Sequence, residues 1–172
     1  MPTFTFPDRQ TGECHTDSPL PVISASTTRS QATAALGLTP TAKSDASSDV
    51  PTPRRSYRLP GEWTIMATPC LVQLHFFDER LVAVSISILS EAEARFFRDN
   101  PSGLLSWDSW SESKEVESNR IQQELLSRTY GNPDETTYPI PGVRYVFSWG
   151  EISAYYDARS AESTTSIRPP LQ

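Results

Sequence analysis

Residues with reactive or metal-binding side chains are scarce in this chain of 172 residues. It has two cysteines, Cys14 and Cys70, and two histidines, His15 and His75. Two cysteines are too few for the disulfide framework of a small secreted domain, and no C-x-x-C or H-x₃₋₅-H spacing occurs. Cys70 and His75 are five residues apart in a predicted strand, so their side chains should point to opposite faces. The sequence therefore predicts no metal site and no cofactor.

Motifs of catalysis and phosphate binding are absent as well. The seven glycines are scattered singly, and neither G-x-G-x-x-G nor G-x-x-x-x-G-K-[ST] occurs. There is no G-x-S-x-G nucleophile motif. His75 is expected to pack in mid-strand or to face water, and Asp157, close to Arg159, is interpreted as half of a strand-end ion pair. These absences favour a protein that is not an enzyme.

Long apolar runs are also missing. The longest, LVAVSISIL at 81–89, is too short to span a bilayer and is broken by serines. The first ten residues, MPTFTFPDRQ, lack the basic and apolar regions of a secretory signal. We therefore expect a soluble, cytoplasmic protein without a membrane partner.

The negative charge is concentrated in the middle of the chain. The net charge is −6, and residues 61–118 hold ten acidic and four basic residues, which accounts for the whole imbalance. Such a chain is a poor ligand for nucleic-acid phosphates. The acidic segment indicates either a well-solvated face or a surface that steers a basic partner, and the sequence leaves both open.

The stretch SWDSWSESKEVES, at 106–118, combines tryptophans with carboxylates at the end of that segment. Tryptophan buries much area at little rotamer cost and is therefore enriched among interface anchors, although these two could also pack as lids of the core. A second acidic pair falls in a predicted tight turn, where ordinary turn chemistry is the alternative. The residues predicted to bind a partner are Trp107, Asp108, Trp110, Glu112, Glu115, Asp78 and Glu79.

Helix and strand signals alternate along the chain and predict an α+β fold. Capping boxes at Thr28/Gln31 and Ser90/Glu93, with Gly37 and Gly131 as stops, predict helices over 29–36, 91–98 and 112–129. Period-two alternation of apolar residues predicts a half-buried antiparallel sheet of about six strands, with the helices on one face. The predicted strands are 55–65, 70–77, 80–88, 143–149, 151–158 and 163–168.

The order of these elements suggests an internal repeat. A helix ended by glycine, a polar connector and a series of strands occur twice, so a single domain over 1–172 would consist of halves 1–90 and 91–172. The alternative is one sheet whose helices merely end in the commonest way. The segment 38–56 is rich in Ser, Thr, Pro and Asp and predicts a mobile loop in the first half.

Two resemblances follow from these segments. ISASTTRSQATAALGLTP, at 23–40, resembles the opening of the tandem-repeat α+β folds of the beta-lactamase inhibitor protein type. The segments LHFFDERLVAVSISI, ELLSRTYGNP and YVFSWGEISAYYDARSAESTTSIR resemble small bacterial immunity proteins, which neutralise toxins delivered by type VI secretion or contact-dependent systems. FSWG at 147–150 and YYDAR at 155–159 are the most specific pieces.

The resemblance implies a role and no set of binding residues. It implies a non-catalytic inhibitor that covers the active site of a cognate toxin effector, and the acidic-aromatic residues above suggest a toxin that is basic at its contact surface. An adaptor or chaperone for a secreted effector is the alternative, and an enzyme without a recognisable motif is a further one.

Overall fold

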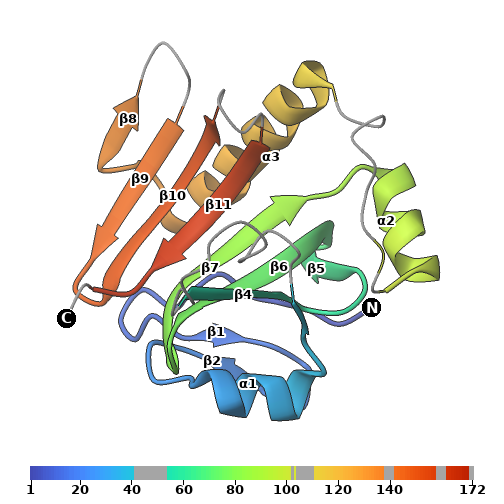
Figure 1. Ribbon diagram of the computed structural model, residues 1–172. Helices are drawn as coiled ribbons and strands as arrows, with labels where there is room; N and C mark the ends of the chain where they lie inside the picture. The colour runs from blue at the N-terminus through green and yellow to red at the C-terminus, as the bar shows by residue number, and fades with distance from the viewer. Residues whose placement is uncertain (41–53, 102, 104–110, 138–141, 158–161, 171–172) are drawn as a thin grey trace, which may run out of the picture.

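A computed structural model describes residues 1–40, 54–101, 103, 111–137, 142–157 and 162–170 (Figure 1). The helices are α1 (Arg29–Leu36), α2 (Glu91–Asp99) and α3 (Glu112–Tyr130). The strands are β1 (Cys14–His15), β2 (Val22–Ile23), β3 (Thr39–Pro40), β4 (Arg54–Arg58), β5 (Trp63–Ile65), β6 (Thr68–Phe77), β7 (Arg80–Ile88), β8 (Glu135–Thr137), β9 (Gly142–Phe147), β10 (Gly150–Asp157) and β11 (Glu162–Arg168).

The main sheet is antiparallel and its strand order is symmetric about the centre. Eight strands follow the order β3-β4-β6-β7-β11-β10-β9-β8, and β5 pairs with β6 outside this path. A helix, an edge strand and a run of longer strands therefore occur twice, and the last strand of each run, β7 or β11, meets the other at the centre. The predicted α+β class and antiparallel sheet are confirmed.

The expected count of six strands was too low. The edge strands β3 and β8 have two and three residues, too short for a period-two pattern to be recognised. The predicted strand 55–65 is in fact two strands, β4 and β5, because the chain bends between them at Pro60-Gly61, where Gly61 has a φ of 77°.

The three helices lie where the capping signals predict them. Thr28 accepts a hydrogen bond from the Gln31 amide, the Gln31 side chain accepts one from the Thr28 amide, and Ser90 and Glu93 do the same for α2. Gly37 adopts the left-handed conformation that ends α1. The predicted boundaries are correct to within one residue.

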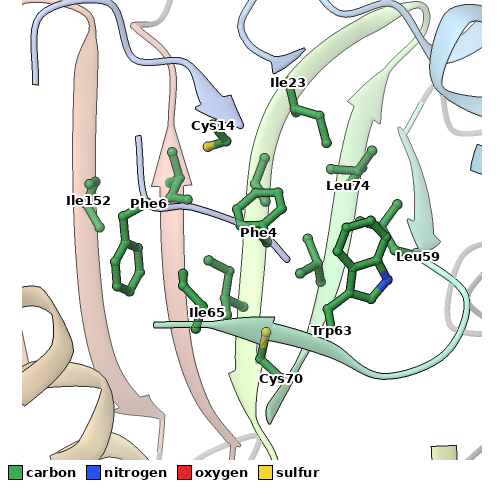
Figure 2. Packing of buried hydrophobic residues seen from close by; sticks show 14 of the residues in the cluster. Phe4, Phe6, Cys14, Ile23, Leu59, Trp63, Ile65, Cys70, Leu74 and Ile152 are labelled. Carbon is green, nitrogen blue, oxygen red and sulfur yellow. The ribbon is translucent and has the colours of Figure 1, made fainter. Parts of the chain in front are cut away.

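One face of the main sheet is buried beneath the first part of the chain, including α1, and beneath α3. Figure 2 shows Phe4, Phe6 and Cys14, from the first part of the chain, gathered with Leu74 of β6 and Ile152 of β10. Leu125 and Leu126 of α3 belong to the same cluster, as do Ala32 and Leu36 of α1. The core therefore joins the two halves of the chain.

Helix α2 does not share this core, contrary to the expectation that all helices pack on one face. Its Ala94 and Phe97 form a separate small cluster with Leu71 and Leu89. Leu71 lies between Cys70 and Val72, which face the main core, so its side chain points to the opposite side of β6. Apolar residues at both Leu71 and Val72 thus give this end of β6 two buried faces.

The two halves of the main sheet meet along a short seam. β7 and β11 pair over three positions, Ile86 with Thr165, Ser85 with Ser166 and Val84 with Ile167. Beyond the seam the end of β7 and the start of β11 separate, and α3 lies beside β11 (Figure 1).

Helix α3 supplies the hydrogen bonds that β11 does not obtain from β7. The backbone N–H of Ser163 donates to the Glu115 carboxylate at 2.8 Å, and the side-chain amide of Gln122 donates to the backbone carbonyl oxygen of Ser163 at 3.2 Å. Because the side chain of Gln122 is buried and also accepts from the Thr165 hydroxyl, α3 is fixed in position over the separation.

The predicted mobile loop over 38–56 is wrong at both ends. Thr39 and Pro40 pair with Arg58 and Tyr57, and β4 begins at Arg54, which pairs with Phe77. Strand pairing with the long strand β6 overrides the polar composition here. Residues 41–53, the middle of that segment, lie outside the described residues.

Candidate functional site

The side of the main sheet opposite the core carries a row of polar side chains, and we call it the open face. Cross-strand register places Ser56 of β4 opposite His75 of β6, and Ser85 of β7 opposite Ser166 of β11. The core-facing residues alternate with these, so the period-two pattern predicted from sequence generates both faces. His75 and Cys70 do lie on opposite faces, as their spacing predicts, since Cys70 belongs to the core.

Two hollows cross the open face. The first, of about 570 Å³, lies between the end of β7, the start of β11 and the first turns of α2 and α3; we call it the acidic hollow. The second, of about 620 Å³, lies over β4, β6, β7, β10 and β11; we call it the arginine hollow. His75, Ser85 and Thr164 line both, so the two form one continuous groove across the seam.

A histidine hydrogen-bonded to two serines forms the middle of this groove. The Ser56 hydroxyl lies 2.8 Å from Nδ1 of His75, and the Ser85 hydroxyl lies 2.8 Å from Nε2. Burial, and to a smaller extent the positive charge of Arg168, lowers the pKa of His75 below its usual value of 6.5. The imidazole is therefore neutral at pH 7, with one ring nitrogen donating and the other accepting.

The acidic hollow has an apolar floor and carboxylates around it. Its apolar lining consists of Leu71, Ile88, Leu89 and Ile121. Its charged lining consists of Glu93, Lys114, Glu115 and Glu117. The backbone amide and hydroxyl of Ser90 hold the Glu93 carboxylate, and Ser163 holds that of Glu115. These donors are neutral, so they orient the carboxylates without cancelling their charge.

The first turns of α3 produce a negative field around this hollow. Burial, and then the charges of Glu112, Glu115 and Asp157, raise the pKa of the Tyr156 phenol on β10. Glu117 is the exception among the acids, because it forms a 2.7 Å ion pair with Arg120, and this hydrogen bond lowers the pKa of Glu117. Of the predicted binding residues, Glu115 lines the acidic hollow, and Glu112, one turn before it on α3, contributes to the negative field at Tyr156.

The second predicted pair, Asp78 and Glu79, lies at the other end of β7. They form the two-residue turn between β6 and β7, with Asp78 at a φ of 55°. The Glu79 carboxylate accepts hydrogen bonds from the Ser30 amide at 3.0 Å and the Arg29 guanidinium at 2.7 Å, and so ties the turn to the start of α1. The nine residues of β7, about 26 Å at the usual rise per residue, separate this turn from Ile88 at the other end of the strand, where α2 and α3 bring carboxylates to the acidic hollow. The structure does not bring the two acidic groups together.

The remaining predicted residues, Trp107, Asp108 and Trp110, lie outside the described residues. Ser111, which follows Trp110, is described and caps α3 by accepting from the Lys114 amide.

The two cysteines are buried in the core, away from the groove. Burial, and then the charge of Glu62, raises the pKa of the Cys70 thiol to about 12, and burial also raises that of Cys14. Both thiols are therefore protonated at neutral pH and are poor nucleophiles. The cavity beside Cys14 and Trp149 is apolar and holds about 30 Å³, the space of a single water molecule.

Two further features are absent from the described residues. They contain no group of three or more His, Cys, Asp or Glu side chains able to hold a metal ion. No helix in the described ranges is long and apolar enough to cross a membrane.

Comparison with known proteins finds no matching family model, no matching curated protein and no matching solved structure.

Several residues of the groove were not singled out from sequence as members of a site. His75 was considered alone. Ser56, Ser85 and Arg168 were not considered as its neighbours, because 10 to 93 positions separate them from His75 along the chain. The available signal was the polar half of each alternating strand, Gln73 and His75 in β6 and Ser85 and Ser87 in β7. Only the strand register shows that these polar residues meet in one groove.

Proposed function

We propose that this chain is a non-catalytic immunity or inhibitor protein, which binds a cognate toxin effector through the acidic hollow and the first turns of α3. The single observation that carries the proposal is the composition of the acidic hollow. A floor of Ile88, Leu89 and Ile121 lies beside the carboxylates of Glu93 and Glu115, in a hollow of about 570 Å³.

The acidic hollow suits a basic segment of a partner protein. The aliphatic stems of Lys and Arg side chains pack on apolar surface while their charged ends reach carboxylates beside it. Charge complementarity of this kind raises the rate of association and excludes partners of like charge. Glu115 is held in place by the Ser163 amide before any partner arrives, which lowers the entropic cost of binding.

The chemistry of His75 favours binding over nucleophilic catalysis. In a Ser-His-Asp arrangement a carboxylate orients the imidazole and stabilises its protonated form. Here both ring nitrogens lie against serine hydroxyls, and among the described residues the charge that shifts the pKa of His75 is the cation Arg168. A cation disfavours the imidazolium that a general base must form.

The other predicted residues have different places in this proposal. Trp107, Asp108 and Trp110 directly precede the N-cap of α3 in sequence and remain candidate anchors for the partner. Asp78 and Glu79 lie at the far end of β7, so only a partner that extends along the length of that strand would contact them as well.

The proposal is tested by co-expressing the chain with the product of a toxin gene next to its own. The full chain should restore growth, form a complex of fixed stoichiometry with the toxin, and turn over nothing. The double variant Glu115→Gln/Glu117→Gln removes two charges, while the amide oxygen introduced at position 115 still offers Ser163 an acceptor. We expect its affinity for the toxin to fall on the order of tenfold.

Glu135→Gln is the matched control. This glutamate lies on the edge strand β8, away from the acidic hollow, and pairs with Arg144. The control variant should bind the toxin as the unmodified chain does. A double variant that protects cells and binds the toxin as well as this control would refute the proposed surface.

A further inference from the structure

The arginine hollow has a charge opposite to that of the whole chain. Its charged lining is Arg54, Arg55, Arg168 and Asp157, a net charge of +2, whereas the chain carries −6. Arg54 and Arg168 come from strands on opposite sides of the β6–β7 pair, 114 positions apart in sequence. A positive hollow on an acidic protein is not a by-product of average composition.

Sheet geometry lets these two arginines reach the same ligand. β4 and β11 are separated by β6 and β7, and at the usual strand spacing their backbones lie about 14 Å apart. Arg168 follows Ile167, which pairs with Val84, and is therefore level with Ala83 and His75, whereas Arg54 pairs with Phe77, two residues or about 7 Å further along β6. Both arginines belong to the open face. Two extended arginine side chains can cover most of this width from its two sides.

The floor between the arginines offers hydroxyl groups. The hydroxyl-bearing residues of the hollow are Ser56, Ser85, Tyr155, Thr164 and Ser166. Because the neutral imidazole of His75 has a single N–H, one of its two serine neighbours accepts from the ring and can donate its own hydroxyl hydrogen elsewhere. The positive charge of Arg168 also contributes to lowering the pKa of His75, as expected for a guanidinium close to the imidazole at the bottom of the arginine hollow.

We infer that the arginine hollow binds a phosphorylated small molecule, with Arg54 and Arg168 contacting the phosphate oxygens from opposite sides of His75 and its two serine neighbours, Ser56 and Ser85. Guanidinium groups match phosphate oxygens in pairs of parallel hydrogen bonds, and hydroxyls supply further donors. A hollow of about 620 Å³ lies within the range of small-molecule sites.

The acidic groups near this site set its geometry. Glu151 lies 3.9 Å from the Arg168 guanidinium and forms a shorter 2.6 Å ion pair with Arg144, so this one carboxylate is shared between two arginines. Arg168 is oriented by the Ser166 hydroxyl, which accepts from its Nε at 3.2 Å. Asp157 lines the opposite side, where it should repel a phosphate and restrict it to the Arg168 side.

The experiment titrates the full chain with inorganic pyrophosphate at low ionic strength, by calorimetry and by amide and imidazole NMR. We expect saturable binding, with shifts at His75, Ser85, Thr164 and Ser166. Arg168→Gln and Arg54→Gln should each weaken binding on the order of tenfold. Arg120→Gln, on an exposed ion pair of α3, is the control and should leave the affinity unchanged.

A nucleoside diphosphate titrated in parallel distinguishes the source of the phosphate group. Tighter binding than pyrophosphate assigns an organic phosphate, and equal binding assigns inorganic pyrophosphate itself. Binding that does not saturate, or that Arg120→Gln weakens as much as Arg168→Gln does, would overturn the inference. Thermal unfolding confirms that each variant is folded, and Arg54→Gln carries the test if Arg168→Gln is not. No partner protein is involved, so the result is independent of the proposed toxin binding.

Discussion

Three side chains of the groove, those of Glu115, Glu93 and His75, form hydrogen bonds with neutral groups. Ser163 orients Glu115, Ser90 orients Glu93, and two serines fix the ring of His75. A hydroxyl or amide restricts the side chain without cancelling its charge or taking up its proton. The groove therefore presents fixed polar groups to whatever binds there.

His75 should make the stability of the fold depend on pH. Its pKa is lower in the folded chain than the ordinary 6.5, because burial and the charge of Arg168 disfavour the imidazolium. On acidification the unfolded chain therefore takes up this proton first. The stabilisation is complete above about pH 6.5 and is lost as the pH falls through the lower folded pKa.

This prediction is measured by denaturant unfolding at pH 7 and pH 5 for the unmodified chain and for His75→Gln. The variant keeps one donor and one acceptor but does not titrate. We expect the free energy of unfolding to fall less between the two pH values in the variant, since the acidic residues contribute equally to both. An equal fall in both proteins would contradict the assignment.

At the scale of elements, α3 replaces a neighbouring strand for the first residues of β11. Glu115 and Gln122 bind the amide and the carbonyl of Ser163, whose strand has already separated from β7. The acidic hollow lies in that separation, with α3 along one side and the end of β7 along the other. The position of this helix thus determines the shape of the proposed partner site.

Gln122→Ala should destabilise the fold by about 2–4 kcal/mol. It leaves the Ser163 carbonyl and the buried Thr165 hydroxyl without their partner and creates a cavity between α3 and β11. Ser127→Ala, on an exposed position of the same helix, should change stability by less than about 0.5 kcal/mol. Chemical denaturation measures both; equal small effects would show that α3 does not depend on this contact.

Local signals predicted the helices well and the short edge strands poorly. Thr28 with Gln31, and Ser90 with Glu93, fix helix starts through bonds within four residues, so sequence alone reveals them. The strands β3 and β8 are too short to show alternation and exist because β4 and β9 offer them an edge. That dependence on a distant strand cannot be read from a short polar segment.

The groove itself was beyond local signals for the same reason. Glu115 was predicted as a binding residue because it lies in an acidic run, and it does line the acidic hollow. Arg168 and Ser56 carry no motif and become part of one hollow only through the register of four strands. Predicting them would have required the order of the strands in the sheet.

At the scale of the whole molecule, the groove crosses the seam between two similar halves. Each half has a helix ended by glycine, an edge strand and a run of longer strands, and the strand order is symmetric about β7 and β11. The core joins both halves, with the Tyr130 hydroxyl of α3 donating to the carbonyl of Pro7. Opposite charges lie in the two hollows of this single groove, the carboxylates beside α3 and the arginines of β4 and β11.

The central claim is that the acidic end of this groove steers and binds a basic toxin. Its most direct test is the association rate constant of the chain with its cognate toxin as ionic strength is raised. We expect that rate to fall steeply with salt, the dissociation rate to change much less, and Glu115→Gln/Glu117→Gln to associate slowly at low salt. An association rate indifferent to salt between about 0.05 and 0.5 M would contradict the claim.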